Sequence, residues 1–229
     1  MAGHTLDGSV VAVVGASGAL GSLIARELAD RGARLVLVGR DQERLAGVPI
    51  EGASTVVADL TDAAAGDRVV QTALDVHGRL DGVVNAAGVV AFGPLVDTED
   101  AVVEELFMTN VIGPLWMIRR VAPTLAETGG FFCNISAVVA EQPLPGMVPY
   151  AAAKAALTAA DSALVRELRR MKVSVIDARP PHTGTGLADR PLAGTAPKLP
   201  RGLDPQVVAR RVVRAIEAGE SEVGSAQFA

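Results

Sequence analysis

The chain has 229 residues, of which 49% are hydrophobic and 21% are charged, and its net charge is -5. These values fit one folded domain with a large core. The negative charge and an aromatic content of 3% argue against nucleic acid as a partner, because that role calls for basic surfaces and stacking rings.

Two features of the sequence bear on the cellular location: the apolar runs and the number of cysteines. The N-terminal residues contain no apolar signal core, and no run reaches about 18 uninterrupted apolar residues. Cys133 is the single cysteine, so no internal disulfide forms, and the apolar run around it predicts a core residue. We therefore expect a cytoplasmic protein with no membrane span, and we identify no metal site.

Strand-like runs alternate with helical patterns along the chain. The runs are 10–14, 34–38, 55–58, 82–84, 131–135 and 173–176, and the tail after a last helical pattern predicts a further edge strand. This alternation predicts a parallel sheet with helices on both faces. We expect one domain over residues 1–229, a three-layer doubly wound α/β structure of the Rossmann type.

The first strand leads directly into three glycines spaced by threes and then into a helical pattern. At such a junction the free N–H groups and the positive dipole end of the helix face the turn and stabilise phosphates. Glycines allow the unusual backbone angles and the close approach that this needs. The order of strand, turn and helix predicts a dinucleotide site formed by Gly15, Ser17, Gly18, Ala19, Leu20 and Gly21.

The end of the second strand bears on the type of dinucleotide. An acidic residue near this place would bind the adenosine ribose hydroxyls, but the chain has Gly39 followed by Arg40. A guanidinium group binds a 2′-phosphate as a fork, whereas a carboxylate repels it. We therefore favour NADP(H) over NAD(H). The alternative is a solvated arginine, and the neighbouring Asp41 weakens the positive charge.

The next two strand ends supply further cofactor contacts. Asp59, followed by Leu60, is placed to accept a hydrogen bond from the adenine amino group, although many loop aspartates only cap a helix. The fourth strand ends in small residues that let the backbone pass close beneath a cofactor, with the Asn tying this strand to its neighbours. These residues are Asn85, Ala86, Ala87 and Gly88.

A long helical pattern from about Asp97 to Leu125 contains Asn110 and Pro114, four residues apart. Proline has no backbone N–H, so the carbonyl of Asn110 loses its usual helical partner. A kinked helix with a free carbonyl can hold an ordered water. A simple packing kink is the alternative explanation.

Tyr150 and Lys154 begin another helical pattern and share one face of it, one turn apart. A phenol titrates near 10 by itself, and an ammonium group within about 4–6 Å lowers its pKa by about 1–3 units. Tyr150 can then exchange a proton near neutral pH. A Tyr-x-x-x-Lys pair alone is more often an ordinary surface pair.

With these residues assembled, the chain resembles the short-chain dehydrogenase/reductase family over nearly its whole length. The matching pieces are GASGALG at 15–21, NAAG at 85–88, Asn110, YAAAK at 150–154, and a Pro180-containing segment after the sixth strand. The resemblance implies a cofactor-dependent carbonyl reductase or alcohol dehydrogenase. It also implies that Tyr150 is the general acid/base, that Lys154 lowers its pKa and holds the nicotinamide ribose, and that Asn110 keeps the water of a proton relay. A homodimer or homotetramer, formed through the helices at about 97–125 and 151–170, is a further implication.

The chain departs from the family pattern at three places. The middle glycine of the turn falls at Ala19, with Gly18 one place earlier, which implies a small shift of the loop. The usual Pro-Gly is Pro180-Pro181, after which Thr183 or Thr185 can bond the nicotinamide carboxamide. The position of the catalytic serine is occupied by Ala137.

The loss of that serine leaves the donor to the substrate oxygen open. Ser136 is adjacent, but neighbouring side chains of a strand point to opposite faces. Ser136 therefore serves only if the strand end bends, and otherwise it is a plain strand residue. His182 and Gln142 are the other candidates. The loss of one such donor costs on the order of 3 kcal/mol in comparable sites, which reduces activity without abolishing it.

Residues 181–203 form a proline- and glycine-containing loop with scattered leucines. We expect this loop to cover the substrate and its leucines to favour a largely apolar one. Asp204 and Pro205 then begin the last helix.

The leading hypothesis is an NADP(H)-dependent oxidoreductase that acts on a small carbonyl or secondary alcohol. A cofactor-binding protein without turnover, such as a redox sensor or structural partner, is the alternative that Ala137 motivates. An isomerase or dehydratase with tightly held cofactor is a third hypothesis.

Overall fold

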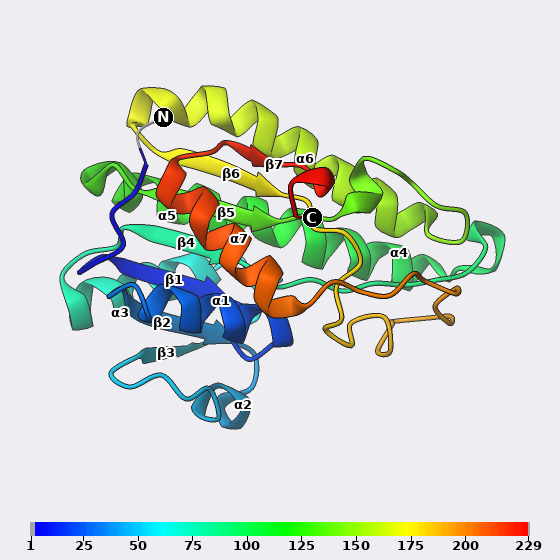
Figure 1. Cartoon of the computed structure of the whole chain (residues 1–229), viewed down its shortest axis with the longest axis horizontal. Helices are drawn as coiled ribbons and strands as arrows, with labels where there is room; N and C mark the ends of the chain where they lie inside the picture. The colour runs from blue at the N-terminus through cyan, green and yellow to red at the C-terminus, as the bar shows by residue number, and fades with distance from the viewer. Residues whose placement is uncertain (1–2, 229) are drawn as a thin grey trace.

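The computed structural model describes residues 3–228. In that part of the chain seven strands form one sheet with the order β3-β2-β1-β4-β5-β6-β7, and all neighbours run parallel (Figure 1). The strand order reverses between β1 and β4, as in a doubly wound sheet, so the predicted fold class is confirmed. The strands are β1 (Val10–Val14), β2 (Arg34–Gly39), β3 (Ser54–Val57), β4 (Gly82–Asn85), β5 (Phe131–Ile135), β6 (Ser174–Ala178) and β7 (Glu222–Val223).

Helices α1 and α7 cover one face of the sheet, and α3, α5 and α6 cover the other (Figure 1). The α-helices are α1 (Ala19–Ala29), α2 (Gln42–Ala46), α3 (Ala65–His77), α4 (Asp100–Phe107), α5 (Gly113–Thr128), α6 (Val148–Glu167) and α7 (Pro205–Ala218). Short 3-10 turns lie at Leu95–Asp97, Val138–Ala140, Leu168–Met171 and Ser225–Phe228.

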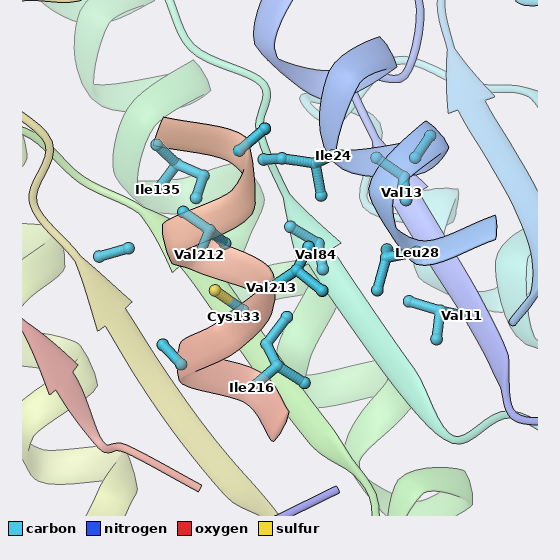
Figure 2. Close-up of a cluster of buried hydrophobic side chains, with 14 of the residues drawn as sticks. Val11, Val13, Ile24, Leu28, Val84, Cys133, Ile135, Val212, Val213 and Ile216 are labelled. Carbon is cyan, nitrogen blue, oxygen red and sulfur yellow. The ribbon is translucent and has the colours of Figure 1, made fainter. Parts of the chain in front are cut away.

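Each face of the sheet buries its own apolar side chains, because successive residues of a strand point to opposite faces. Figure 2 shows the α1/α7 face, where strand residues meet both helices. The residues in this view include Val11, Val13, Val84 and Cys133 from the strands and Ile24, Leu28, Val212, Val213 and Ile216 from the helices. Cys133 is therefore a core residue, as predicted, and burial raises the pKa of its thiol.

The helical stretch Asp100–Thr128 combines α4, a π turn at Met108–Ile112 and α5. The π turn lies where the sequence predicted a kink, around Asn110 and just before Pro114. Within residues 3–228 this stretch alone is long and apolar enough to cross a membrane by length and composition. It packs against α3, α6 and β5, which is the position of a core helix in a soluble fold.

The predicted strands agree with the observed ones to within two residues at every end, and the tail supplies the edge strand β7. Asp204 caps α7 by accepting a hydrogen bond from the backbone N–H of Gln206 at 2.8 Å. Most of the predicted site segments follow the carboxyl ends of strands, Tyr150 and Lys154 lie in the first turns of α6, and Asn110 lies in the π turn between α4 and α5. The fold therefore gathers them along one edge of the sheet.

Candidate functional site

The glycine turn after β1 is packed against the segment that follows β4. Gly15 has a φ of +79°, and a Cβ there would lie 2.8 Å from the backbone nitrogen of Ala87. A Cβ on Gly21 would overlap the carbonyl oxygen of Gly15. Only glycine permits both the backbone angle and the contact. Two predicted cofactor segments thus meet at the point where the strand order reverses.

The first turn of α1 is open toward this junction. The helix begins at Ala19, and its N-cap residue Gly18 supplies no side chain to the free backbone N–H groups. No acidic residue lies in the first turn. Free amide groups and a positive dipole end next to a glycine cradle fit a pyrophosphate group.

Two arginines flank the far side of the cradle, beyond β2. Arg40 is exposed and lies 3.7 Å from Asp59. Arg44, which sequence reasoning missed, donates a hydrogen bond to the carbonyl oxygen of Ser17 at 3.2 Å. Asp41 caps α2 by accepting from the N–H of Arg44, so its side chain is turned to that helix. The signal for Arg44 was its place in the turn that follows Arg40.

Asp59 lies at the end of β3, where its carboxyl group binds the next turn. Its Oδ1 accepts from the backbone N–H and the hydroxyl of Thr61 at 2.9 and 2.8 Å. Partial burial raises the pKa of Asp59, but the Thr61 hydrogen bonds and the Arg40 charge outweigh it and hold that pKa below its usual value. Leu60 is buried and packs against Gly113.

The segment after β4 is tied to the neighbouring strand, as predicted for Asn85. Asn85 donates to Asn134 Oδ1 at 2.9 Å and accepts from the N–H of Ala87 at 3.3 Å. A Cβ on Gly88 would lie 3.0 Å from Asn110 Oδ1 and 3.6 Å from Lys154 Nζ. Gly88, Asn110 and Lys154 therefore meet at one point, although they come from three different segments.

Asn110 uses its side chain as a clamp on the chain after β4. It donates to the carbonyl oxygens of Val89 and Leu106 at 3.0 and 2.9 Å, and accepts from the N–H of Val89 at 3.3 Å. The sequence drew attention to the backbone carbonyl of Asn110, and this role of the amide was missed. A buried amide with three partners fixes the position of the segment that contains Gly88.

Lys154 is 4% exposed and donates to the carbonyl oxygen of Ile135 at 2.9 Å. Burial lowers the pKa of its ammonium group to about 8, and the buried carboxyl groups of Asp177 and Asp161 oppose that shift. Tyr150, one turn earlier on α6, is 7% exposed, and burial raises the pKa of its phenol. The predicted lowering of the tyrosine pKa is wrong for this arrangement, because loss of solvent is what acts on the phenol here.

Ser136 and Ala137 point in different directions at the end of β5. The hydroxyl of Ser136 lies 3.3 Å from the carbonyl oxygen of Lys154 and 3.0 Å from the hydroxyl of Thr158, so α6 engages it. Ala137 instead packs against the apolar side chains around Tyr150. The strand end does not bend as a catalytic Ser136 requires, and the geometry favours a structural serine.

Tyr150 lies in an apolar group of side chains that we name the tyrosine cluster. Its buried members besides Tyr150 are Val90, Ala91, Phe92, Leu106, Val139, Met147 and Ala151. Loop 181–203 is docked against it: the N–H of Leu192 donates to Val90 at 2.8 Å, and that of Phe92 donates to Ala193 at 3.0 Å. Leu187 and three alanines of the loop pack on the cluster. The loop is thus docked on the cluster that contains the tyrosine.

Residues of this loop itself line a cavity of about 290 Å³. His182 and Thr183 contribute to its wall, together with Asp189 and Leu199. The hydroxyl of Thr183 donates to the carbonyl oxygen of Pro181 at 2.8 Å, and the carbonyl oxygen of Pro180 accepts from Val138 at 3.0 Å. Gln142 is exposed on a different loop.

Comparison with known proteins gives consistent matches. The family model for short chain dehydrogenase matches residues 9–193. The chain is 30% identical to dehydrogenase/reductase SDR family member 7B of Danio rerio, over 92% of this chain and 75% of that protein. It is also 30% identical to the ketoacyl reductase HetN of Nostoc sp., over 96% of this chain and 79% of that protein. A short chain dehydrogenase from Burkholderia cenocepacia, solved in complex with NADP, has a TM-score of 0.86 at 26% identity, over 97% of this chain and 90% of that one.

Proposed function

This chain belongs to the short-chain dehydrogenase family and is an oxidoreductase acting on CH–OH or C=O groups, and from that premise we propose that it moves a hydride between NADP(H) and a small, largely apolar substrate. The observation that carries this proposal is the meeting of Gly88, Asn110 and Lys154, one helical turn from Tyr150. The open glycine cradle lies along the same edge of the sheet.

The cradle residues Gly15, Ser17, Gly18, Ala19, Leu20 and Gly21 would hold the pyrophosphate. Arg40 and Arg44 support NADP(H), because the guanidinium groups of Arg44, at Ser17, and of the exposed Arg40, after β2, suit a 2′-phosphate. The solved relative from Burkholderia cenocepacia also contains NADP. Asp59 and Leu60 would contact the adenine, and Asn85, Ala86, Ala87 and Gly88 would lie beneath the cofactor. Pro180 and Thr183 would lie near the carboxamide.

The chemistry then falls to few side chains. When bound, the nicotinamide supplies or accepts the hydride. Tyr150 gives or takes the proton at the substrate oxygen, and Lys154 holds the ribose. Asn110 fixes the segment above Lys154 and would keep the water of a proton relay. Loop 181–203 excludes water from the tyrosine, and its apolar side chains favour an apolar substrate.

We place the protein in the cytoplasm, as one domain with loop 181–203 as its substrate cover, and propose a homodimer or homotetramer. The helical stretch Asp100–Thr128 and α6 are the surfaces for that assembly. Size-exclusion chromatography with light scattering tests the assembly, and a monomer at micromolar concentration contradicts it.

Cofactor titration tests the function. NADPH is added while its fluorescence is followed, and the titration is repeated with NADH and with the variants Arg40→Glu and Arg170→Glu. We expect NADPH to bind at least about tenfold more tightly than NADH, and Arg40→Glu to remove the preference. Arg170 is exposed beyond the far end of α6 and serves as the charge-matched control. No binding of either cofactor contradicts the function, whereas tighter NADH binding contradicts only the role of the arginines.

The alternative is a cofactor-binding sensor without turnover, which Ala137 in place of the serine motivates. A panel of aldehydes and ketones distinguishes the two functions. Turnover that disappears in Tyr150→Phe supports the enzyme. NADPH binding with equal, near-zero rates for both proteins supports the sensor, and conversion without net oxidation of cofactor supports an isomerase or dehydratase.

A further inference from the structure

A row of three polar side chains crosses the buried face of the sheet behind Lys154. Asn85, Asn134 and Asp177 occupy the same register on β4, β5 and β6, and each is at most 4% exposed. Asn134 receives a hydrogen bond from Asn85 and donates to Oδ1 of Asp161 on α6 at 2.7 Å. Asp161 is fully buried. Polar groups at these positions are costly unless each has a partner.

The row reaches the proposed active site through Lys154. Its Nζ donates to Ile135, the residue after Asn134, and Asp161 lies two turns further along the same face of α6. Each of the two carboxyl groups of Asp177 and Asp161, when it is ionised, favours the charged form of the Lys154 ammonium group. The proposed function assigns no role to either carboxyl group.

Two oxygens of this cluster have no hydrogen-bond partner, namely Oδ2 of Asp161 and Oδ1 of Asp177. Two ionised carboxylates near each other in a buried site repel, and each would leave one oxygen unsatisfied. A proton on one of them removes the repulsion and leaves only one buried charge to be stabilised. Burial and the charge of Asp177 raise the pKa of Asp161 well above its usual value, and burial also raises that of Asp177.

The surroundings decide which carboxyl group is neutral. Asp177 receives a hydrogen bond from Thr158 and lies 3.6 Å from Arg179, which also pairs with Glu141 and Glu222 at 2.9 Å each. Asp161 accepts a hydrogen bond from the neutral amide of Asn134, and its burial outweighs both that bond and the charge of Lys154. The charged form is therefore better supported at Asp177.

We propose that Asp161 and Asp177 hold one proton between them, with Asp161 as the neutral acid and Asp177 as the counter-ion that keeps Lys154 charged. Both are positioning residues that act through Lys154. This inference rests on the proposed roles of Tyr150 and Lys154. It adds a buried element that sets the pH range in which the pair works. Thr158 and Ser136 belong to it, because their hydroxyl groups join Asp177 to the backbone of Lys154.

The test measures the ionisation of Lys154 directly. The chain has only three lysines, so NMR of protein labelled at the lysine ε-carbon resolves each one during a pH titration. The exposed Lys172 and Lys198 are internal references. In the cofactor-free wild type we expect a pKa of about 8 for Lys154. Asp177→Asn should lower it by about 1–3 units, because an opposite charge is lost. Asp161→Asn should leave it nearly unchanged, because an amide replaces a neutral acid.

Equal shifts in both variants, a larger shift in Asp161→Asn, or no shift in either would overturn the proposal. If Asp177→Asn does not fold, the double variant Asp161→Asn/Asp177→Asn is compared with Asp161→Asn, since two amides can donate to and accept from each other. The same lowering is expected. Asp177→Glu should restore the wild-type value.

The titration needs neither cofactor nor turnover, so its result is independent of the proposed function. If the pKa of Lys154 shifts as expected but Tyr150→Phe retains activity, the proposed function is contradicted and the proposal of a buried counter-ion stands. If the enzyme is active and depends on Tyr150 but the pKa of Lys154 does not change in Asp177→Asn, the proposal of a buried counter-ion is contradicted and the proposed function stands.

Discussion

The two halves of the proposed site are built in opposite ways. The cradle around Gly15 consists of backbone, opens toward solvent and is flanked by the exposed charges of Arg40 and Asp59. The half around Tyr150 consists of side chains and is covered by loop 181–203. An open backbone cradle can receive charged phosphates, whereas a dry pocket strengthens the interactions that move a proton. Substitutions that remove this contrast therefore test both halves.

The largest effect is expected for Tyr150→Phe, which removes the proton donor and leaves the apolar ring. We expect kcat for carbonyl reduction to fall about 10²–10⁴-fold, while NADPH binding stays near that of the wild type. Steady-state kinetics and fluorescence titration measure the two quantities. Retention of more than a tenth of the activity contradicts the role of Tyr150.

His182→Leu addresses the donor that replaces the absent serine. His182 is partly buried in the wall of the cavity within loop 181–203, whereas Gln142 is exposed. We expect the histidine variant to lose about 10²-fold in kcat with a smaller change in KM, as for other donors to a developing oxyanion. Gln142→Ala is the control and should retain full activity. The reverse result would assign the donor to Gln142.

The backbone half can be broken at Gly15 without touching a side chain. An alanine at φ +79° is strained, and its Cβ would press on the nitrogen of Ala87. We expect NADPH affinity to fall about tenfold or more, since hydrogen bonds to the charged phosphates are lost. Gly8→Ala is a matched control, because Gly8 has a φ of +72° and open space around its Cβ position. Equal losses in both variants would mean that strain alone is responsible.

The same contrast explains what sequence reasoning recovered. The cradle, the strands and the pair Tyr150–Lys154 depend on local spacing, so the pattern of Gly15, Gly18 and Gly21 was enough to predict that segment. The register of Asn85, Asn134 and Asp177 depends on three strands far apart in the sequence. Asp161 and Asp177 read as ordinary helix and strand residues, because no local signal shows that both face Lys154. The direction of the Tyr150 pKa depends on the burial of its phenol in the folded chain, which spacing cannot give.

Gly194→Ala should detach loop 181–203 from the half of the site around Tyr150. Gly194 has a φ of +74°, and a Cβ there would overlap the carbonyl oxygen of Phe92, against which the loop docks. Tyr150 is the only tyrosine, so tyrosinate absorbance in a pH titration reports its phenol alone. We expect the pKa of Tyr150, raised by burial in the wild type, to fall toward about 10 when the loop leaves. Gly186→Ala, at a similar φ of +70° but with only an ordinary contact of 3.6 Å between its Cβ and Asp189 Oδ2, should not change it. An unchanged titration in Gly194→Ala would show that the loop does not bury the tyrosine.

The smallest expected effect concerns stability and follows from Asp161. A carboxyl group whose pKa is raised on folding favours the folded state most at low pH, and stability is lost as pH rises above the unfolded value of about 4. Asp161→Asn removes this loss while keeping the bond to Asn134, so it should raise the free energy of unfolding at neutral pH by on the order of 2 kcal/mol. Urea denaturation at pH 5 and pH 7 measures it, with the exposed Asp189→Asn as control. The advantage of Asp161→Asn should grow from the lower to the higher pH. A constant difference would mean that Asp161 binds the same number of protons in the folded and unfolded states between pH 5 and pH 7, whereas a decreasing one would reverse the sign of the argument. Asp161 lies on the same face of α6 as Lys154. If Asp161 is the neutral partner of Asp177, Asp161→Asn must both raise the free energy of unfolding at neutral pH and leave the pKa of Lys154 unchanged.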